Sequence, residues 1–102
     1  KSENLGILLD LGHLKVTSNL LKFNANNFIE NFKNKIYLVH IHENDGEVDE
    51  HKCIKKGDWS LKVMQKYFKS LDIPVVLECK CNSKKELNNS LKILKGYNED
   101  AF

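Results

Sequence analysis

Histidine and carboxylate side chains gather in one short stretch of the sequence. The letters HIHENDGEVDEH at positions 40–51 place His40, His42, Asp49 and His51 around an Asn-Asp-Gly triplet. That triplet alone predicts only a turn. Imidazole nitrogens and carboxylate oxygens on both sides of a turn, however, are ligands that zinc, manganese and iron accept. We therefore predict that this stretch binds a divalent metal, zinc or manganese.

Three apolar runs of the chain each end in a residue that can bind a metal ion. The runs 5–10, 36–42 and 74–78 end in Asp10, His42 and Glu78, and His13 follows the first run closely. Short apolar runs bounded by turn residues predict buried parallel strands. The carboxyl ends of parallel strands meet at one edge of a sheet, where α/β proteins carry their active sites. We expect Asp10, His42 and Glu78 to share one metal ion there.

Each candidate ligand also has a structural interpretation. Asp10 could cap the turn that follows its strand, and Glu78 could pair with a lysine. An unpaired carboxylate after an apolar strand is costly, which favours ligation for Glu78. Asp49 and His51 could belong to a solvated loop, since charged residues surround them. His40 precedes His42 by two residues, so we expect it one layer deeper, hydrogen-bonded to a ligand rather than being one.

Amphipathic segments separate the predicted strands. We expect a helix over residues 26–35 and leave residues 14–24 as loop or a frayed helix. Asp58 is predicted to cap a helix, and Ser83 with Glu86 forms a capping box for the last one. The polar loop 43–57 is long enough to suggest a function or disorder. The inward faces are predicted to hold Phe28, Ile29 and Phe32, then Leu61, Met64, Phe68 and Leu71, then Leu87, Leu91 and Leu94. This alternation predicts an α/β fold with a parallel sheet.

Composition limits the classes of protein and partner. The 102 residues suit a single domain (1–102), and 41% apolar with 29% charged residues is ordinary for a globular protein. No apolar stretch approaches the roughly 18 residues of a membrane span, so we expect no membrane partner. The formal charge of +2 and the absence of arginine give little support to a nucleic-acid partner. The chain begins at Lys1 and reaches its first strand within a few residues, so we expect it to be part of a longer protein.

The three cysteines are Cys53, Cys79 and Cys81, with no C-x-x-C pair. An odd number of cysteines favours free intracellular thiols over disulfides. We therefore expect a cytoplasmic protein in which these thiols are not metal ligands.

Three motifs resemble those of the xylose-isomerase-like TIM barrel superfamily, which holds sugar isomerases and epimerases together with endonuclease IV. LDLGH at 9–13 resembles the family's D-x-x-H, HIHENDG at 40–46 with DEH at 49–51 resembles H-x-H-D-N-D-G…D-x-H, and VVLE at 75–78 resembles a strand that ends in a glutamate ligand. The resemblance implies three consecutive βα units of a TIM (β/α)8 barrel, the sixth to the eighth. Such a partial barrel cannot close, so it would need the missing amino-terminal barrel half or a partner chain.

The resemblance also implies roles for individual residues. Asp10, His42 and Glu78 would bind the metal shared across the superfamily. His13, Asp49 and His51 would form the additional zinc site of endonuclease IV or bind substrate in the isomerases. Some positions depart from the family. Glu43 stands where aspartate is usual, KKGDW at 55–59 replaces a longer G-x-G-x-I-D-W, and the glutamate that would be the fourth shared ligand is not in the chain.

Two activities follow from the resemblance, with a non-catalytic assembly or regulatory module as a third possibility. The first is a metal-dependent isomerase or epimerase acting on a small sugar or sugar phosphate, with an enediolate stabilised at the metal and Glu78 as a catalytic base. Its phosphate could bind Lys52, Lys55 and Lys56, which are otherwise a solvated rim. The alternative is a zinc phosphodiesterase acting on abasic DNA. By either reading the chain alone is expected to be inactive.

Overall fold

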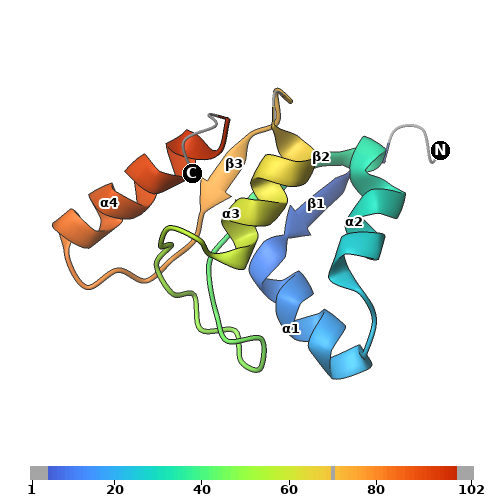
Figure 1. Cartoon of the computed structure of the whole chain (residues 1–102), viewed down its shortest axis with the longest axis horizontal. Coiled ribbons are helices and arrows are strands. Elements are labelled where there is room, and N and C mark those ends of the chain that lie inside the picture. The colour runs from blue at the N-terminus through green and yellow to red at the C-terminus, as the bar shows by residue number, and fades with distance from the viewer. Residues whose placement is uncertain (1–4, 70, 99–102) are drawn as a thin grey trace.

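The computed structural model describes residues 5–69 and 71–98 of the chain. In this part, three strands form one parallel sheet in the order β1-β2-β3 (Figure 1). They are β1 (Ile7–Asp10), β2 (Ile36–Ile41) and β3 (Val75–Leu77). Asp10 lies beside His40 in the register of β1 and β2, and His40 lies beside Val76 in that of β2 and β3. The sheet therefore ends at one edge in the polar residues that the sequence singles out.

Helices follow each strand, and in Figure 1 α3 crosses in front of the sheet, with α4 on one side of it and α1 and α2 on the other. Polar caps set where three of them begin. Asp10 accepts a hydrogen bond from the His13 backbone N–H, and Asn24 and Ser83 cap the later helices in the same way. The helical elements are α1 (Leu11–Leu21), α2 (Ala25–Phe32) with the 3₁₀ turn η2 (Lys33–Lys35), α3 (Trp59–Val63) continued by the π-helix η3 (Met64–Phe68), and α4 (Lys84–Lys95) with the 3₁₀ turn η4 (Gly96–Asn98).

The two faces of the sheet differ in what covers them. Leu9, Val39 and Ile41 point to the side of the helices and are buried in one core with residues such as Phe68. Side chains alternate along a strand, so Asp10 and His40 point the other way. On that second face Leu8 is 52% and Val76 40% exposed. Within the described residues, one sheet face is therefore packed and the other is open.

The predicted fold class is wrong in its specific form. The described residues form an open three-stranded sheet and not units of a closed (β/α)8 barrel. A single βα unit has one helix, whereas α1 and α2 both lie between β1 and β2. Three strands also cannot close a barrel. The coarser expectation of strands paired in parallel and alternating with helices agrees with the structure.

Two expectations about helices are also corrected. Residues 14–24, left as loop or frayed helix, lie mostly in α1, because the Asp10 cap starts a helix at Leu11. Leu94 of α4 is buried, but Leu87 and Leu91 are more than a third exposed, as is Leu71 after η3. In α4 it is Ser90 that faces inward, because its hydroxyl accepts a hydrogen bond from the Ile54 backbone N–H at 3.2 Å.

The expectation of three free thiols is wrong for two of them. Cys53 and Cys81 form a disulfide, and Cys79 is free. The two segments meet because the Lys80 backbone N–H donates to the His51 carbonyl at 2.8 Å. This contact brings residues 26 or more positions apart to the same place, which cysteine spacing in the sequence does not reveal.

None of the helices in the described part of the chain is long and apolar enough to cross a membrane.

Candidate metal centre

The predicted ligands come from the ends of the three strands and from the loop after β2. Asp10 ends β1, and His13 stands in the first turn of α1. His40 lies in β2 and His42 just beyond it, while Glu78 follows β3 directly. The structure brings all of them, with Asp49 and His51, to one edge of the sheet, in two groups that His42 joins.

The first group consists of Asp10, His40 and Glu78. One ligand atom from each lies within 4.8 Å of the others. His40 Nδ1 is 2.8 Å from Glu78 Oε1. His40, expected only to support a ligand, thus occupies the place next to Asp10 and Glu78 that the sequence suggested for His42. The reason is that β2 ends at Ile41. The His40 side chain therefore follows the alternation of the strand, whereas His42 lies beyond the strand and does not.

The second group consists of His13, Asp49 and His51, again with one ligand atom of each within 4.8 Å of the others. His13 Nε2 contacts Asp49 Oδ2, and its Nδ1 lies 3.2 Å from Asp10 Oδ2. His51 Nδ1 donates to the Glu78 carbonyl at 2.8 Å, and its Nε2 lies 3.1 Å from Asp49 Oδ2. Metal-binding histidines are commonly oriented by such a hydrogen bond to a backbone carbonyl.

His42 lies between the two groups and is completely buried. Its Nε2 is 2.9 Å from Asp49 Oδ1 and 3.5 Å from Asp10 Oδ1, and its ring stacks on that of His51 with centroids 3.9 Å apart. Among the described residues, neither ring nitrogen of His42 nor Asp49 Oδ1 has a hydrogen-bond partner. Buried polar atoms without partners are rare and need an explanation. A cation held between these two facing atoms would provide one.

The protonation of this centre depends on its histidines. Burial raises the pKa of Asp49, but the hydrogen bond from His13 and the charges of the neighbouring histidines outweigh it and hold the pKa below its usual value. The hydrogen bond to the Glu78 carbonyl raises the pKa of His51. Burial opposes this rise and the Asp49 carboxylate adds to it. Asp49 is therefore an anion that can bind a cation.

Two backbone features position this centre, and the sequence reading missed both. A Cβ on Gly12 would lie 2.0 Å from atoms of the His42 ring, so only glycine lets α1 pass so close to that ring. His51 has a φ of 54°, a conformation that non-glycine residues rarely adopt and that clusters at functional sites. Gly12 can be read from the LDLGH motif, but its contact with the His42 ring cannot.

The loop after β2 is anchored by buried polar side chains. Glu43 Oε1 accepts from Lys15 Nζ at 3.1 Å, and Oε2 accepts from the Ser60 backbone N–H at 2.9 Å and from the Ser60 hydroxyl. Asn44 donates to the Gly12 carbonyl at 3.1 Å and accepts from the Gly46 N–H at 2.7 Å. The predicted Asn-Asp-Gly turn therefore also ties the loop to α1, which fixes the position from which Asp49 and His51 reach the centre.

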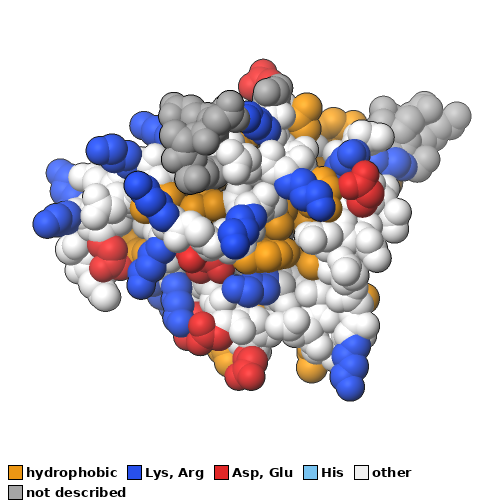
Figure 2. All heavy atoms as spheres, viewed as in Figure 1, with side chains coloured by type: hydrophobic (Ala, Val, Ile, Leu, Met, Phe, Trp, Pro, Cys, Tyr) orange, Lys and Arg blue, Asp and Glu red, His pale blue; other side chains and the backbone are white. Residues whose placement is uncertain are grey.

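Lys52, Lys55 and Lys56, predicted to bind a substrate phosphate, lie elsewhere. They line a cavity of about 880 Å³ together with Lys15 and Lys80, and none of the six predicted metal ligands lines it. Lys52 also pairs with Asp45 at 3.1 Å. Lysine side chains are abundant on the face seen in Figure 2, with fewer carboxylates among them. The role of these three lysines in substrate binding stays a prediction.

Comparisons with known proteins give relatives without a stated activity. The chain is 36% identical over 92 residues to an uncharacterized protein of Methanocaldococcus jannaschii, covering 87% of this chain and 37% of that protein. It is 31% identical over 98 residues to a second uncharacterized protein of the same organism, covering 96% of this chain and 33% of that protein. The chain thus spans only 33–37% of the length of these relatives. No family model matches the chain, and no solved structure does.

Proposed function

We propose that this chain provides a divalent metal centre, zinc or manganese, for a metal-dependent enzyme acting on phosphate-containing substrates. The observation that carries the proposal is a pair of buried atoms, His42 Nε2 and Asp49 Oδ1, that lie 2.9 Å apart and form no hydrogen bond. Imidazole and carboxylate groups are the donors that these metals accept. The motif resemblance to xylose-isomerase-like proteins supports the same type of centre.

The grouping of the ligands favours phosphodiester hydrolysis. Two groups of three residues, linked by His42, offer donors for two ions. Two neighbouring ions can lower the pKa of water and hold both the attacking and the leaving oxygen of a phosphoester. His13 bridges Asp10 and Asp49 and so keeps the two groups in register. Abasic DNA is the substrate suggested by the resemblance, although the chain has no arginine for phosphate.

Isomerisation or epimerisation of a sugar or sugar phosphate is the second candidate. The Glu78 side chain is 39% exposed, so a carboxylate is accessible beside His40 and Asp10. An isomerase needs such a base to remove the proton next to a carbonyl group, and the metal stabilises the enediolate that results. One metal ion is enough for this chemistry.

Metal titration of the oxidised protein tests the centre. The Cys53–Cys81 disulfide keeps two of the three sulfurs from binding metal, so isothermal titration with Zn²⁺ reports the histidine and carboxylate ligands. We expect two ions per chain for the phosphodiesterase and one for the isomerase. Asp49→Asn should weaken binding at least about tenfold. Asp72→Asn, the same substitution at an exposed position, is the control.

Activity is best measured with the full-length gene product, because this chain spans a minor part of its relatives. Incision of an abasic-site oligonucleotide lost in Asp49→Asn would support hydrolysis, and interconversion of ketoses and aldoses lost in Glu78→Gln would support isomerisation. Zinc binding that is equally strong in wild type and Asp49→Asn would refute the proposed centre. Metal binding without either activity would favour a non-catalytic role.

A further inference from the structure

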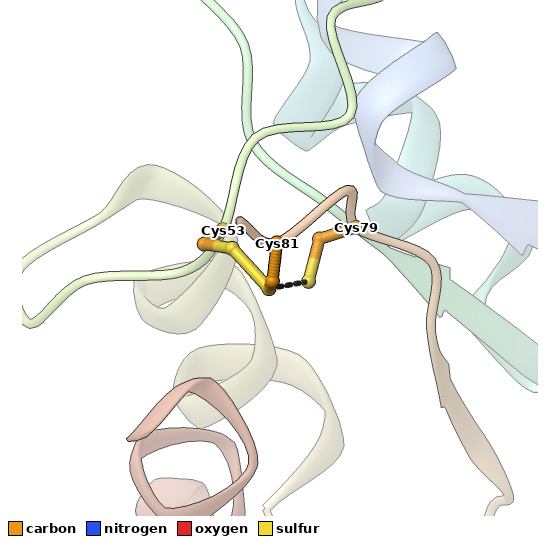
Figure 3. A group of neighbouring side chains, drawn as sticks. All are labelled: Cys53, Cys79 and Cys81. Carbon is orange, nitrogen blue, oxygen red and sulfur yellow. Dashed lines mark hydrogen bonds between the residues drawn. A yellow bond between two sulfur atoms is a disulfide. The ribbon is translucent and has the colours of Figure 1, made fainter. Parts of the chain in front are cut away.

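A second group of metal-capable side chains lies outside the centre just described. One sulfur from each of Cys53, Cys79 and Cys81 lies within 4.8 Å of the others. Figure 3 shows Cys53 on one loop segment and Cys79 and Cys81 on the segment after β3, with the sulfurs turned toward each other. Cys79 Sγ is 3.2 Å from Cys81 Sγ, which is itself bonded to Cys53. Three sulfurs therefore converge where a disulfide needs only two.

A carboxylate adds a fourth donor. Glu86 Oε1 lies 2.9 Å from Cys53 Sγ. Glu86 is fixed in the first turn of α4, because its backbone N–H donates to the Ser83 hydroxyl at 3.1 Å. The segment that carries Cys79 and Cys81 is held to the loop by the bond from the Lys80 N–H to the His51 carbonyl. Backbone contacts thus hold Glu86 and the segment with Cys79 and Cys81 in place in addition to the disulfide.

We propose that in the reduced protein Cys53, Cys79, Cys81 and Glu86 bind one Zn²⁺ ion, and that the Cys53–Cys81 disulfide is the oxidised form of the same site. Zinc takes four ligands in a tetrahedron, with thiolates preferred and carboxylates accepted. Copper(I) also prefers thiolates, but a carboxylate is a poor ligand for it. The fourth donor therefore favours zinc.

The two states interconvert by a balanced exchange with an external dithiol. The dithiol is oxidised to its own disulfide, and its two hydrogens end on Cys53 and Cys81 as the bond between them breaks. Zinc then displaces the protons of the three thiols, which leave to solvent, and three zinc–sulfur bonds form. In the reverse direction the disulfide form of that dithiol accepts the two electrons of the Cys53 and Cys81 thiolates and two protons from solvent, the Cys53–Cys81 bond forms again, and the ion is released. The site would then couple zinc binding in this loop to the redox state of the surroundings.

Cobalt(II) as a zinc substitute tests this site separately from the histidine centre. Thiolate ligands give Co²⁺ an intense sulfur-to-metal charge-transfer band in the near ultraviolet, which imidazole and carboxylate ligands cannot produce. Protein reduced by a dithiol, and then freed of it without air, should show this band when Co²⁺ is added. Excess Zn²⁺ should abolish the band, and air-oxidised protein should lack it.

Three variants complete the experiment. Cys79→Ser keeps the two cysteines of the disulfide and should lose most of the band, whereas Asp49→Asn, which alters only the histidine centre, should retain it. Glu86→Gln should keep a sulfur band and weaken Zn²⁺ binding at least about tenfold. Circular dichroism of each variant checks its fold. A reduced wild-type protein without the band, or a Cys79→Ser protein with the full band, overturns the proposal, whatever the histidine centre does.

Discussion

The strongest indication of a metal ion comes from His42 and Asp49, because each has a buried side-chain atom without a hydrogen bond. Two buried atoms at 2.9 Å would normally share a hydrogen bond, yet His42 Nε2 and Asp49 Oδ1 form none. A buried acceptor or donor without a partner costs about 1–3 kcal/mol. A divalent cation held by both atoms would remove that cost, because imidazole nitrogen and carboxylate oxygen are both ligands for such ions.

Sequence reasoning identified the residue types of the candidate ligands but not their grouping. Asp10, His42 and Glu78 were recognisable because each ends an apolar run. Residues two apart on a strand share a face, so the sequence allowed either His40 or His42 beside Glu78. His40 takes that place because β2 ends at Ile41. Beyond the strand, the backbone of Glu43 pairs with that of Lys52, so His42 lies where the loop begins. Such a pairing leaves no pattern in the sequence.

Gly12 gives the most local prediction. Gly12→Ala adds a methyl group that would overlap the buried His42 ring, so we expect a loss of about 1–3 kcal/mol in the free energy of unfolding and weaker Zn²⁺ binding. Helix propensity alone would predict the opposite sign, a gain of up to about 1 kcal/mol. Urea unfolding and zinc titration of the same sample measure both effects.

Gly6→Ala is the matched control for that substitution. Its Cβ would meet the ring of Tyr37, but this side chain is 62% exposed and can rotate away. We therefore expect a small change in stability and unchanged zinc binding. If Gly12→Ala bound zinc as tightly as Gly6→Ala, the position of the His42 ring would not matter for the metal.

At the scale of elements, the loop between β2 and α3 is the part that sequence alone described least well. Its length suggested function or disorder, yet it is tied at both ends. Glu43 joins it to Lys15 of α1 and to Ser60 of α3, and Ile54 joins it to Ser90 of α4. The helices were easier to predict from periodicity, but periodicity does not say what covers a face, so Leu87 and Leu91 of α4 were misplaced.

Glu43→Ala tests whether that anchoring sets the loop. The substitution leaves the partly buried Lys15 ammonium and the Ser60 N–H without their acceptor, and breaking a buried pair costs about 3 kcal/mol or more. We expect that loss in urea unfolding, together with weaker zinc binding because Asp49 and His51 lose their fixed position. Glu47→Ala, an exposed residue of the same loop, should stay within about 0.5 kcal/mol of wild type. Equal stability of the two variants would contradict the anchoring role.

For the whole molecule, the open face of the sheet sets the context of the centre. Leu8 and Val76 are exposed on the face that carries Asp10 and His40. The sequence led us to expect another polypeptide segment or a partner chain on this side, and the greater length of the two relatives agrees with that expectation without testing it. The strands and their parallel order could be predicted because apolar runs and turns are local signals. What packs against the open face could not be predicted, because no local pattern in these residues specifies it.

Removing the metal is expected to lower the thermal stability of the whole chain. Ions held by Asp10, His42, Asp49 and Glu78 would link the ends of all three strands and the loop, and the unfolded chain has no such arrangement. Zinc at one hundred times its Kd would then stabilise the folded state by ~2.7 kcal/mol, since it binds the native state alone. For a domain of this size that corresponds to a rise in Tm of roughly 10–20 °C. Calorimetry of the oxidised protein with zinc and with EDTA measures it, and Asp49→Asn should show much less of the rise. A Tm that is the same with zinc and with EDTA would mean that these strand ends do not hold an ion in common.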